Sequence, residues 1–262
     1  MKKTVLSFFV TLFVLSSFVL QTFAAPMRYR WYCMHVKDHK QPTIGADVAF
    51  VEEFGAYFID HAHTDSNAED KVIYLTFDAG YENGNIAKIL DILRDENVPA
   101  AFFILQNLIY KNADLVKRMT VEGHTVCNHT AHHKDMSNCS DEAFLAELKT
   151  LEALYSEQIG GQMAKYYRPP EGTFSRENIV CANENGYKTI FWSFAYPDWD
   201  NLKQMSTEKA KQVILDNVHN GAVMLLHPTS ATNAAILSDV IHAIKEMGYR
   251  FGTLDELTGA GA

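Results

Sequence analysis

The sequence predicts an α/β protein whose strands form one parallel sheet, either open or closed as a barrel. From residue 71 onward, short runs of β-branched and aromatic residues alternate with amphipathic stretches, which is typical of repeated strand–helix units. The chain has 262 residues, of which 47% are hydrophobic, so it suits one large folded domain. Its formal net charge of −9 and the lack of a long basic run argue against nucleic-acid binding.

The predicted elements alternate along the chain. Strands are expected at residues 72–77, 100–105, 124–128, 165–167, 188–194, 222–226 and 249–253. Helices are expected from 86 to 98, 112 to 123, 140 onward, 175 to 186, 207 to 220 and 233 to 247. Apolar residues spaced three and four apart indicate these helices, and caps such as Ser140 and terminal glycines such as Gly123 mark their ends.

The start of the chain has the composition of a secretory signal peptide. Lys2 and Lys3 precede an apolar run over Val5–Leu20, and small residues at Thr22 and Ala24 suit cleavage after Ala24. We therefore expect a secreted or cell-envelope protein. A retained membrane anchor is the alternative, because the run is near the lower end of the roughly 17–25 residues that span a bilayer.

Export permits disulfides, but the cysteines form no dense framework. They are Cys33, Cys127, Cys139 and Cys181. Four cysteines allow three full pairings, and the sequence does not choose among them. We favour free, mostly buried thiols.

Polar residues gather where the predicted strands end. The residues are Asp78, His129, His133, Arg168, Asp198 and His227. In parallel α/β folds the loops converge at the carboxyl ends of the strands, and the chemistry takes place there. Each residue alone has a simpler interpretation, such as a turn or cap role for an aspartate after a strand. Chance would rarely place five such clusters on one rim.

Jointly, these residue types suit a metal-assisted amide or ester hydrolase. Imidazoles are ligands for a zinc-like ion, with positions left open for water and substrate. A nearby carboxylate can take a proton from the bound water, whose pKa the ion lowers to about 7. A separate histidine can protonate a departing nitrogen. An Arg–Asp ion pair behind the carboxylate would fix its rotamer and tune its pKa.

The ordered motifs resemble those of the polysaccharide deacetylases of the NodB-homology type. They are Thr76-Phe77-Asp78-x-Gly80, His129-Thr130-x-x-His133, Arg168-x-Pro170, Asp198-Trp199 and Leu226-His227. Closer still, Tyr81-Glu82-Asn83-Gly84, the paired His132-His133 and Phe54-Gly55-Ala56-Tyr57 are similar to the delta-lactam-forming peptidoglycan N-acetylmuramic acid deacetylases of spore-forming bacteria.

This resemblance implies a distorted (β/α) barrel of the NodB-homology type with fewer than eight complete units. Together with the composition of the earlier residues, it divides the chain into an expected signal peptide at 1–24, an N-terminal extension at 25–70 and a deacetylase domain at 71–257, where the resemblance lies. The extension is expected to pack on the main domain. The expected contacts are Phe50, Phe54, Tyr57 and Phe58.

The resemblance also implies catalytic roles. Asp78 would be the general base, and His129 and His133 would be the metal ligands. Arg168, held by Asp198, would orient Asp78. The metal would be a divalent ion, zinc or else cobalt or manganese.

Further roles follow for residues around the substrate. His227 would be the general acid, and the backbone N–H of Glu171 would help to bind the oxyanion. Trp199 would form a wall of the acetyl pocket, with Tyr81 and Leu225 as further substrate contacts. The expected partner is a peptidoglycan glycan strand, and the protein is expected to act as a monomer. No nucleic acid is expected to bind, and no membrane contact is expected beyond an uncleaved N-terminal anchor. Removal of the N-acetyl groups of the glycan strand would feed muramic delta-lactam formation in the spore cortex.

Two departures from the family pattern matter. Ala79 stands where most of the wider family has a metal-ligating carboxylate, so the ion would be weakly held, and Glu171 stands where an arginine is common. Two alternatives stay open. One is a deacetylase of N-acetylglucosamine in peptidoglycan or chitin oligomers, and the other is a glycan-binding module without turnover.

Overall fold

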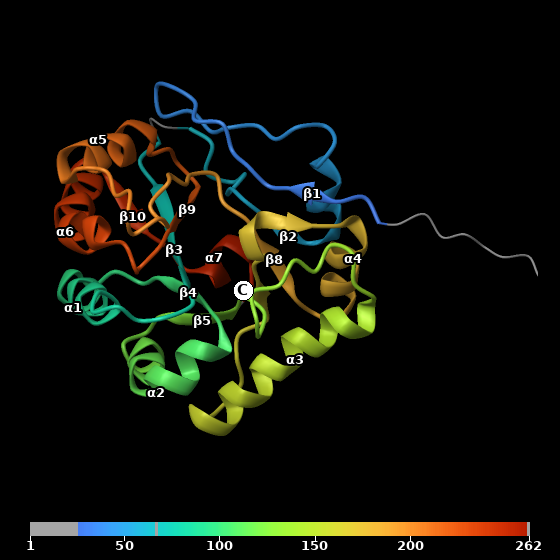
Figure 1. The fold of residues 1–262 in the computed structure, drawn as a ribbon. Helices are drawn as coiled ribbons and strands as arrows, with labels where there is room; N and C mark the ends of the chain where they lie inside the picture. Colours follow the sequence, from blue (N-terminus) through green and yellow to red (C-terminus); the bar gives the residue numbers. More distant parts are fainter. Residues whose placement is uncertain (1–25, 66–67, 261–262) are drawn as a thin grey trace, which may run out of the picture.

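The computed structural model describes residues 26–65 and 68–260. The expected signal peptide at 1–24 lies outside these residues. Figure 1 shows a curled sheet at the centre of the molecule with helices around its outside. Among the described residues, no helix is long and apolar enough to cross a membrane.

The large sheet is built around β3 (Lys71–Ala79). β4 (Ala101–Ile104), β9 (Ala222–Leu226) and β10 (Tyr249–Phe251) all pair with β3 in parallel. From β4 the sheet continues through β5 (Thr125–Asn128), β6 (Tyr166–Tyr167), β8 (Lys188–Ile190) and β2 (Ala56–Tyr57). β3 is buried along almost its whole length, as expected for a strand covered on both faces.

The sheet curls until its two ends meet. Phe194, which follows β8, forms an isolated parallel bridge with Met224 of β9, and β9 in turn pairs with β3. Ile59, which follows β2, forms a second isolated bridge, an antiparallel one, with Ala222 of β9. The ring is thus closed by isolated bridges rather than by a full ladder. The distorted barrel predicted from the sequence is confirmed, and its carboxyl strand ends meet at one mouth.

Seven helices cover the described part of the barrel. They are α1 (Ile86–Glu96), α2 (Gln106–Val121), α3 (Asp141–Gln158), α4 (Arg176–Glu184), α5 (Thr207–Asn217), α6 (Ala231–Glu246) and α7 (Leu254–Thr258). Ile86, Ile89, Leu90 and Leu93 of α1 are fully buried, which confirms their predicted stripe. Asn97, the cap that follows the last residue of α1, has a φ of 53°, which is the left-handed cap conformation.

Several predicted boundaries were wrong. The helix expected to start at Asn112 begins at Gln106, and Asn112 lies inside it with non-helical φ and ψ of −143° and 43°. An asparagine side chain favours non-helical backbone, so here it marks a kink instead of a start. Helix α5 stops at Asn217, and α6 begins at Ala231 with Ser230 as its cap.

Two strand pairings join the N-terminal segment to the barrel. β1 (Tyr29–Arg30) pairs in antiparallel fashion with β7 (Thr173–Phe174), and β2 adds a strand beside β8. The 3-10 helix η1 (Ala49–Phe54) brings Phe50 into an aromatic cluster with Trp31 and Phe174. The segment thus contributes both a strand and core side chains.

The cysteines of the described residues are free thiols, as the sequence analysis favoured. Cys127 and Cys181 are buried, and Cys33 and Cys139 are partly buried.

Candidate active site

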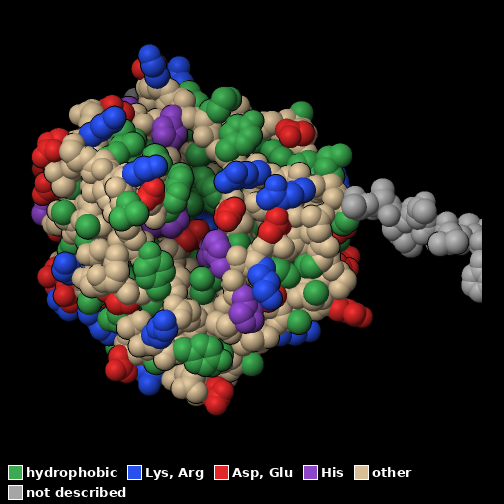
Figure 2. All heavy atoms as spheres, viewed as in Figure 1, with side chains coloured by type: hydrophobic (Ala, Val, Ile, Leu, Met, Phe, Trp, Pro, Cys, Tyr) green, Lys and Arg blue, Asp and Glu red, His purple; other side chains and the backbone are tan. Residues whose placement is uncertain are grey.

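A cavity of about 880 Å³ opens at the carboxyl ends of the strands. Figure 2 shows the surface hollowed there, with histidine and acidic side chains inside the hollow. Eight of the predicted site residues line it, namely Asp78, Tyr81, His129, His133, Glu171, Trp199, Leu225 and His227. The other two, Arg168 and Asp198, lie buried behind its wall. The structure therefore brings together residues that lie up to 149 positions apart in the sequence, from Asp78 to His227 (227 − 78 = 149).

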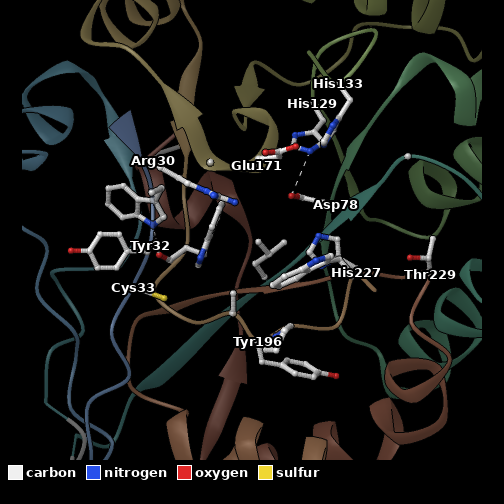
Figure 3. A pocket seen from close by; sticks show the side chains of 18 of the residues that line it. Arg30, Tyr32, Cys33, Asp78, His129, His133, Glu171, Tyr196, His227 and Thr229 are labelled. Carbon is white, nitrogen blue, oxygen red and sulfur yellow. Dashed lines mark hydrogen bonds and ion pairs between the residues drawn. The ribbon is translucent and has the colours of Figure 1, made fainter. Parts of the chain in front are cut away.

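Asp78 lies at the end of β3, between the two sets of histidines. Figure 3 shows His129 and His133 on one side of it and His227 on the other. Its Oδ1 accepts a hydrogen bond of 2.8 Å from Arg168 Nη1, and its Oδ2 lies 3.6 Å from His129 Nε2. Burial opposes the charged carboxylate, but the neighbouring His129, Arg168 and His227 outweigh burial and lower the pKa of Asp78. It is therefore ionised at neutral pH, as a general base must be.

Arg168 is fully buried, and each of its nitrogens has a partner. Nη2 donates to Thr76 Oγ1 at 2.9 Å and to the Phe191 carbonyl at 3.1 Å, and Nε donates to the Ile190 carbonyl at 2.9 Å. The guanidinium also lies over the ring of Phe103, 4.1 Å from its centroid. A buried charge needs such complete pairing, and the result is a rigid support for Asp78.

The predicted ion pair between Arg168 and Asp198 was wrong. Asp198 is buried on the other side of the site, where its Oδ1 accepts from His227 Nδ1 at 2.7 Å. Its Oδ2 accepts from the His227 backbone N–H at 2.7 Å and from Asn233 Nδ2 at 2.6 Å. Backbone carbonyls and Thr76 take the place that the sequence analysis gave to Asp198 around Arg168.

His227 is therefore held by an aspartate rather than standing alone. Burial lowers the pKa of its imidazole, but the hydrogen bond to Asp198 and the charge of Asp198 outweigh burial and raise it. The bond at Nδ1 leaves Nε2 as the ring nitrogen available to the cavity. This arrangement favours a protonated imidazole, as a general acid requires.

Substituting Asp198 with asparagine should move the alkaline limb of the kcat/KM pH profile to lower pH. The raised pKa keeps His227 protonated to higher pH, so loss of the carboxylate charge should let it deprotonate earlier. Profiles of the wild type and Asp198→Asn measure this shift. Asp200→Asn is the matched control, because Asp200 caps the Leu202 N–H in the same loop. An unmoved limb, or one at higher pH, would contradict the prediction.

The two predicted metal ligands lie side by side. The rings of His129 and His133 have centroids 5.0 Å apart. Thr130 and His133 both have positive φ, 68° and 56°, and the Thr130 hydroxyl accepts from the His133 backbone N–H at 3.0 Å. This tight turn brings the second imidazole back beside the first. His132 turns outward instead, to Glu147 of α3 at 2.9 Å.

His129 has the features of a metal ligand. Its Nδ1 donates to the Arg168 carbonyl at 2.8 Å, so its Nε2 carries the lone pair and faces Asp78. Burial lowers the pKa of His129 to about 4, so the ring is neutral at neutral pH, as ligation requires. Ala79, buried at the end of β3, offers no donor.

The donor set fits a divalent ion held by two imidazoles. Among the described residues, no group of three His, Cys, Asp or Glu side chains is placed to hold a metal. Catalytic zinc sites usually have three protein ligands and one open position, so here water and substrate oxygens would have to fill at least two positions. We therefore expect weak binding of the ion.

The predicted substrate residues differ in their surroundings. Glu171 has a φ of 55° within the short 3-10 helix η2 (Pro170–Gly172), so the backbone turns at the cavity edge. Leu225 is buried in the cavity wall, whereas Trp199 is 60% exposed and packs edge-on to His227, with centroids 6.2 Å apart. Tyr81 accepts a hydrogen bond of 2.9 Å from Asn201 at the rim.

One whole wall of the cavity was not predicted from the sequence. This wall is formed by residues of the N-terminal segment, namely Arg30, Trp31, Tyr32 and Cys33. They were not predicted because no motif or periodicity marks them. Asn233 was also not predicted, although its place on the buried face of α6 is a signal that could have been noticed. A polar residue on an apolar helix face needs a buried partner.

Comparison with known proteins agrees with this geometry. Residues 65–190 match the polysaccharide deacetylase family. The peptidoglycan N-acetylmuramic acid deacetylase PdaA of Bacillus subtilis is 34% identical over 228 residues, 87% of this chain and 84% of the relative. The peptidoglycan N-acetylglucosamine deacetylase PgdA of Listeria monocytogenes is 34% identical over 72% of this chain and 39% of the relative.

Solved structures show the same likeness. The structure of Bacillus subtilis PdaA, a family 4 carbohydrate esterase, is 33% identical and has a TM-score of 0.83 over 90% of this chain and 98% of that chain. A family 4 carbohydrate esterase from Bacillus anthracis is 32% identical with a TM-score of 0.73, over 90% and 99% of the two chains. This chain belongs to the polysaccharide deacetylase family. It is a hydrolase that acts on amide bonds.

Proposed function

We propose that this enzyme removes the N-acetyl group of N-acetylmuramic acid in peptidoglycan glycan strands, outside the cell or in its envelope. The observation that carries the proposal is the convergence of Asp78, two imidazoles and an Asp198-held His227 on one cavity. The similarity to PdaA over nearly the whole of both folds supports muramic acid as the substrate. In a spore-forming cell, the amine released could close a lactam with the lactyl group of the same sugar.

The chain's own residues account for both proton transfers. Asp78 takes a proton from water as the water oxygen bonds to the acetyl carbon. The backbone N–H of Glu171 stabilises the oxyanion that forms. Protonated His227 then gives its proton to the nitrogen as the C–N bond breaks, which yields acetate and a free amine.

Other side chains position these groups. Arg168 holds the Asp78 carboxylate at one oxygen, and this leaves the other oxygen free to face the cavity. Trp199 and Leu225 exclude water around the acetyl methyl. A divalent ion held by His129 and His133 would supply Lewis-acid activation of the water and the acetyl oxygen.

Removing divalent metal should abolish acetate release. Purified protein is expected to release acetate from peptidoglycan whose stem peptides have been removed, to lose this activity with a chelator and to regain it with zinc, cobalt or manganese. Because two imidazoles, His129 and His133, are the only protein ligands that we assign to the ion among the described residues, we expect gel filtration without added metal to strip the ion as well. Activity that persists in chelator would contradict the metal assignment. No acetate release with any metal would contradict the proposed function.

Two other functions have an observation in their favour. The similarity to PgdA favours N-acetylglucosamine as the substrate, and acetate release from chitin oligomers, compared with stripped peptidoglycan, distinguishes the two sugars. Ala79 favours a glycan-binding protein without turnover. Glycan retention without acetate release, together with activity that appears only in Ala79→Asp, would support that function.

A further inference from the structure

Arg30 is the one lysine or arginine among the described residues that line the cavity. Figure 3 shows its guanidinium pointing from the N-terminal wall into the open space, on the side of Glu171. Within the described part of the chain it forms no ion pair with a carboxylate. The cavity therefore contains a cation that the reaction itself does not use.

The backbone around Arg30 is held firmly. Arg30 is paired with Thr173 across the β1–β7 ladder. The next residue, Trp31, donates its backbone N–H to the Gly172 carbonyl at 2.7 Å and its indole N–H to the Trp192 carbonyl at 2.9 Å. The indole is buried and stacks on Phe191 with centroids 4.2 Å apart. The pairing with Thr173 and the fixed Trp31 keep the backbone of Arg30 at the cavity.

This ladder ties Arg30 to the loop that carries Glu171. Gly172, directly after Glu171, has a φ of 64°, and a Cβ there would come within 3.0 Å of Trp31 Cβ. A glycine is needed for this close approach. Arg30 thus lies on the strand next to the loop to which we assign the oxyanion N–H, and its side chain enters the same cavity.

We propose that Arg30 binds the free carboxylate of the lactyl group of N-acetylmuramic acid and makes the cavity selective for this sugar. The inference rests on the proposed function and specifies it. N-acetylglucosamine lacks the lactyl group, so a guanidinium distinguishes the two sugars by charge. Arginine matches a carboxylate with two parallel N–H donors. Glu171 on the same wall would repel the carboxylate, which leaves Arg30 as its partner.

The test compares Arg30→Gln with Arg28→Gln. Arg28 lies two residues earlier, is exposed and pairs with Asp135 at 2.8 Å, and it does not line the cavity. On stripped peptidoglycan, Arg30→Gln should lower kcat/KM by about tenfold to a hundredfold, mainly through KM, as for loss of a charge-assisted hydrogen bond. On N-acetylglucosamine oligomers it should change little, and Arg30→Lys should restore part of the loss. Arg28→Gln should match the wild type on both.

A modified substrate gives a second readout. In this substrate, the lactyl carboxylates of stripped glycan are converted to methyl esters. The kcat/KM of the wild type on the ester should fall to that of Arg30→Gln on the unmodified stripped glycan. Arg30→Gln should then lose nothing further on the ester. An equal loss on all substrates, or additive losses from the variant and the ester, would overturn the inference and leave the proposed function standing.

Binding separates this inference from the proposed function. In an Asp78→Asn background, adding Arg30→Gln should lower the affinity for stripped glycan oligomers. Esterifying the lactyl carboxylates of the oligomers should lower the affinity of Asp78→Asn by a similar factor. If the wild type releases no acetate from stripped peptidoglycan, the proposed function fails, and this binding difference decides the role of Arg30. Binding that ignores both changes would overturn that role.

Discussion

Asp78→Asn should lower the turnover of acetate release at least about a hundredfold, as expected when a general base is removed. Asparagine has nearly the same shape and still offers an oxygen to Arg168, but it cannot accept the proton of the attacking water. The other acceptors of Arg168, which are Thr76 and the Ile190 and Phe191 carbonyls, remain in place. The substitution therefore removes the proton acceptor and leaves the position of Arg168 unchanged.

A matched control separates lost chemistry from lost stability. Asp60 is another buried aspartate, which accepts from Tyr74 Oη at 2.5 Å and does not line the cavity. Both Asp78→Asn and Asp60→Asn should lower the free energy of unfolding in urea by less than the roughly 3–5 kcal/mol that follows outright removal of a buried charge partner. Only Asp78→Asn should lose turnover. Retained activity in Asp78→Asn would reassign the base.

His227→Ala should also lower amide hydrolysis by about a hundredfold or more, because the departing nitrogen then lacks its proton donor. The loss should depend on the leaving group. An activated aryl acetate releases a phenolate that needs no proton, so its hydrolysis should fall far less. Acetate release from stripped peptidoglycan and from 4-nitrophenyl acetate, measured side by side, gives this comparison.

The control for His227 is a histidine from the same motifs that points elsewhere. His132 is exposed and bound to Glu147 of α3, so His132→Ala should keep both activities. Added imidazole should restore part of the activity of His227→Ala, because the site is open to solvent. An equal loss on the amide and the aryl ester would mean that His227 acts on the attack step instead.

The order and type of the main elements could be predicted because they depend on local pattern. The apolar stripe of α1 and the buried run of β3 follow from periodicities that the chain carries by itself. The placement of Asp78, His129 and His227 at one mouth followed from a general rule, since parallel strands deliver their carboxyl ends to the same edge. Boundaries were less predictable, as the kink at Asn112 shows.

Pairing among the gathered residues was a different matter. The sequence predicted that Arg168 and Asp198 lie at one rim, and it predicted an ion pair between them. In the fold, Arg168 pairs with Asp78, and Asp198 pairs with His227. Opposite charges at one rim can pair in several ways, and the choice depends on which backbone carbonyls and helix residues complete each shell. Here the Ile190 and Phe191 carbonyls and Asn233 of α6 made that choice.

The residue types and their order along the chain thus predicted the chemistry that we propose: a base, two metal ligands and an acid at strand ends. Only the tertiary structure decided that Arg168 binds Asp78 and that Asp198 binds His227. Only the tertiary structure, through the β1–β7 ladder, brought Arg30 to the cavity. The physical reason is that such a ladder joins segments more than 140 positions apart, as in the pairing of Arg30 with Thr173 (173 − 30 = 143). No local periodicity records a contact of that range.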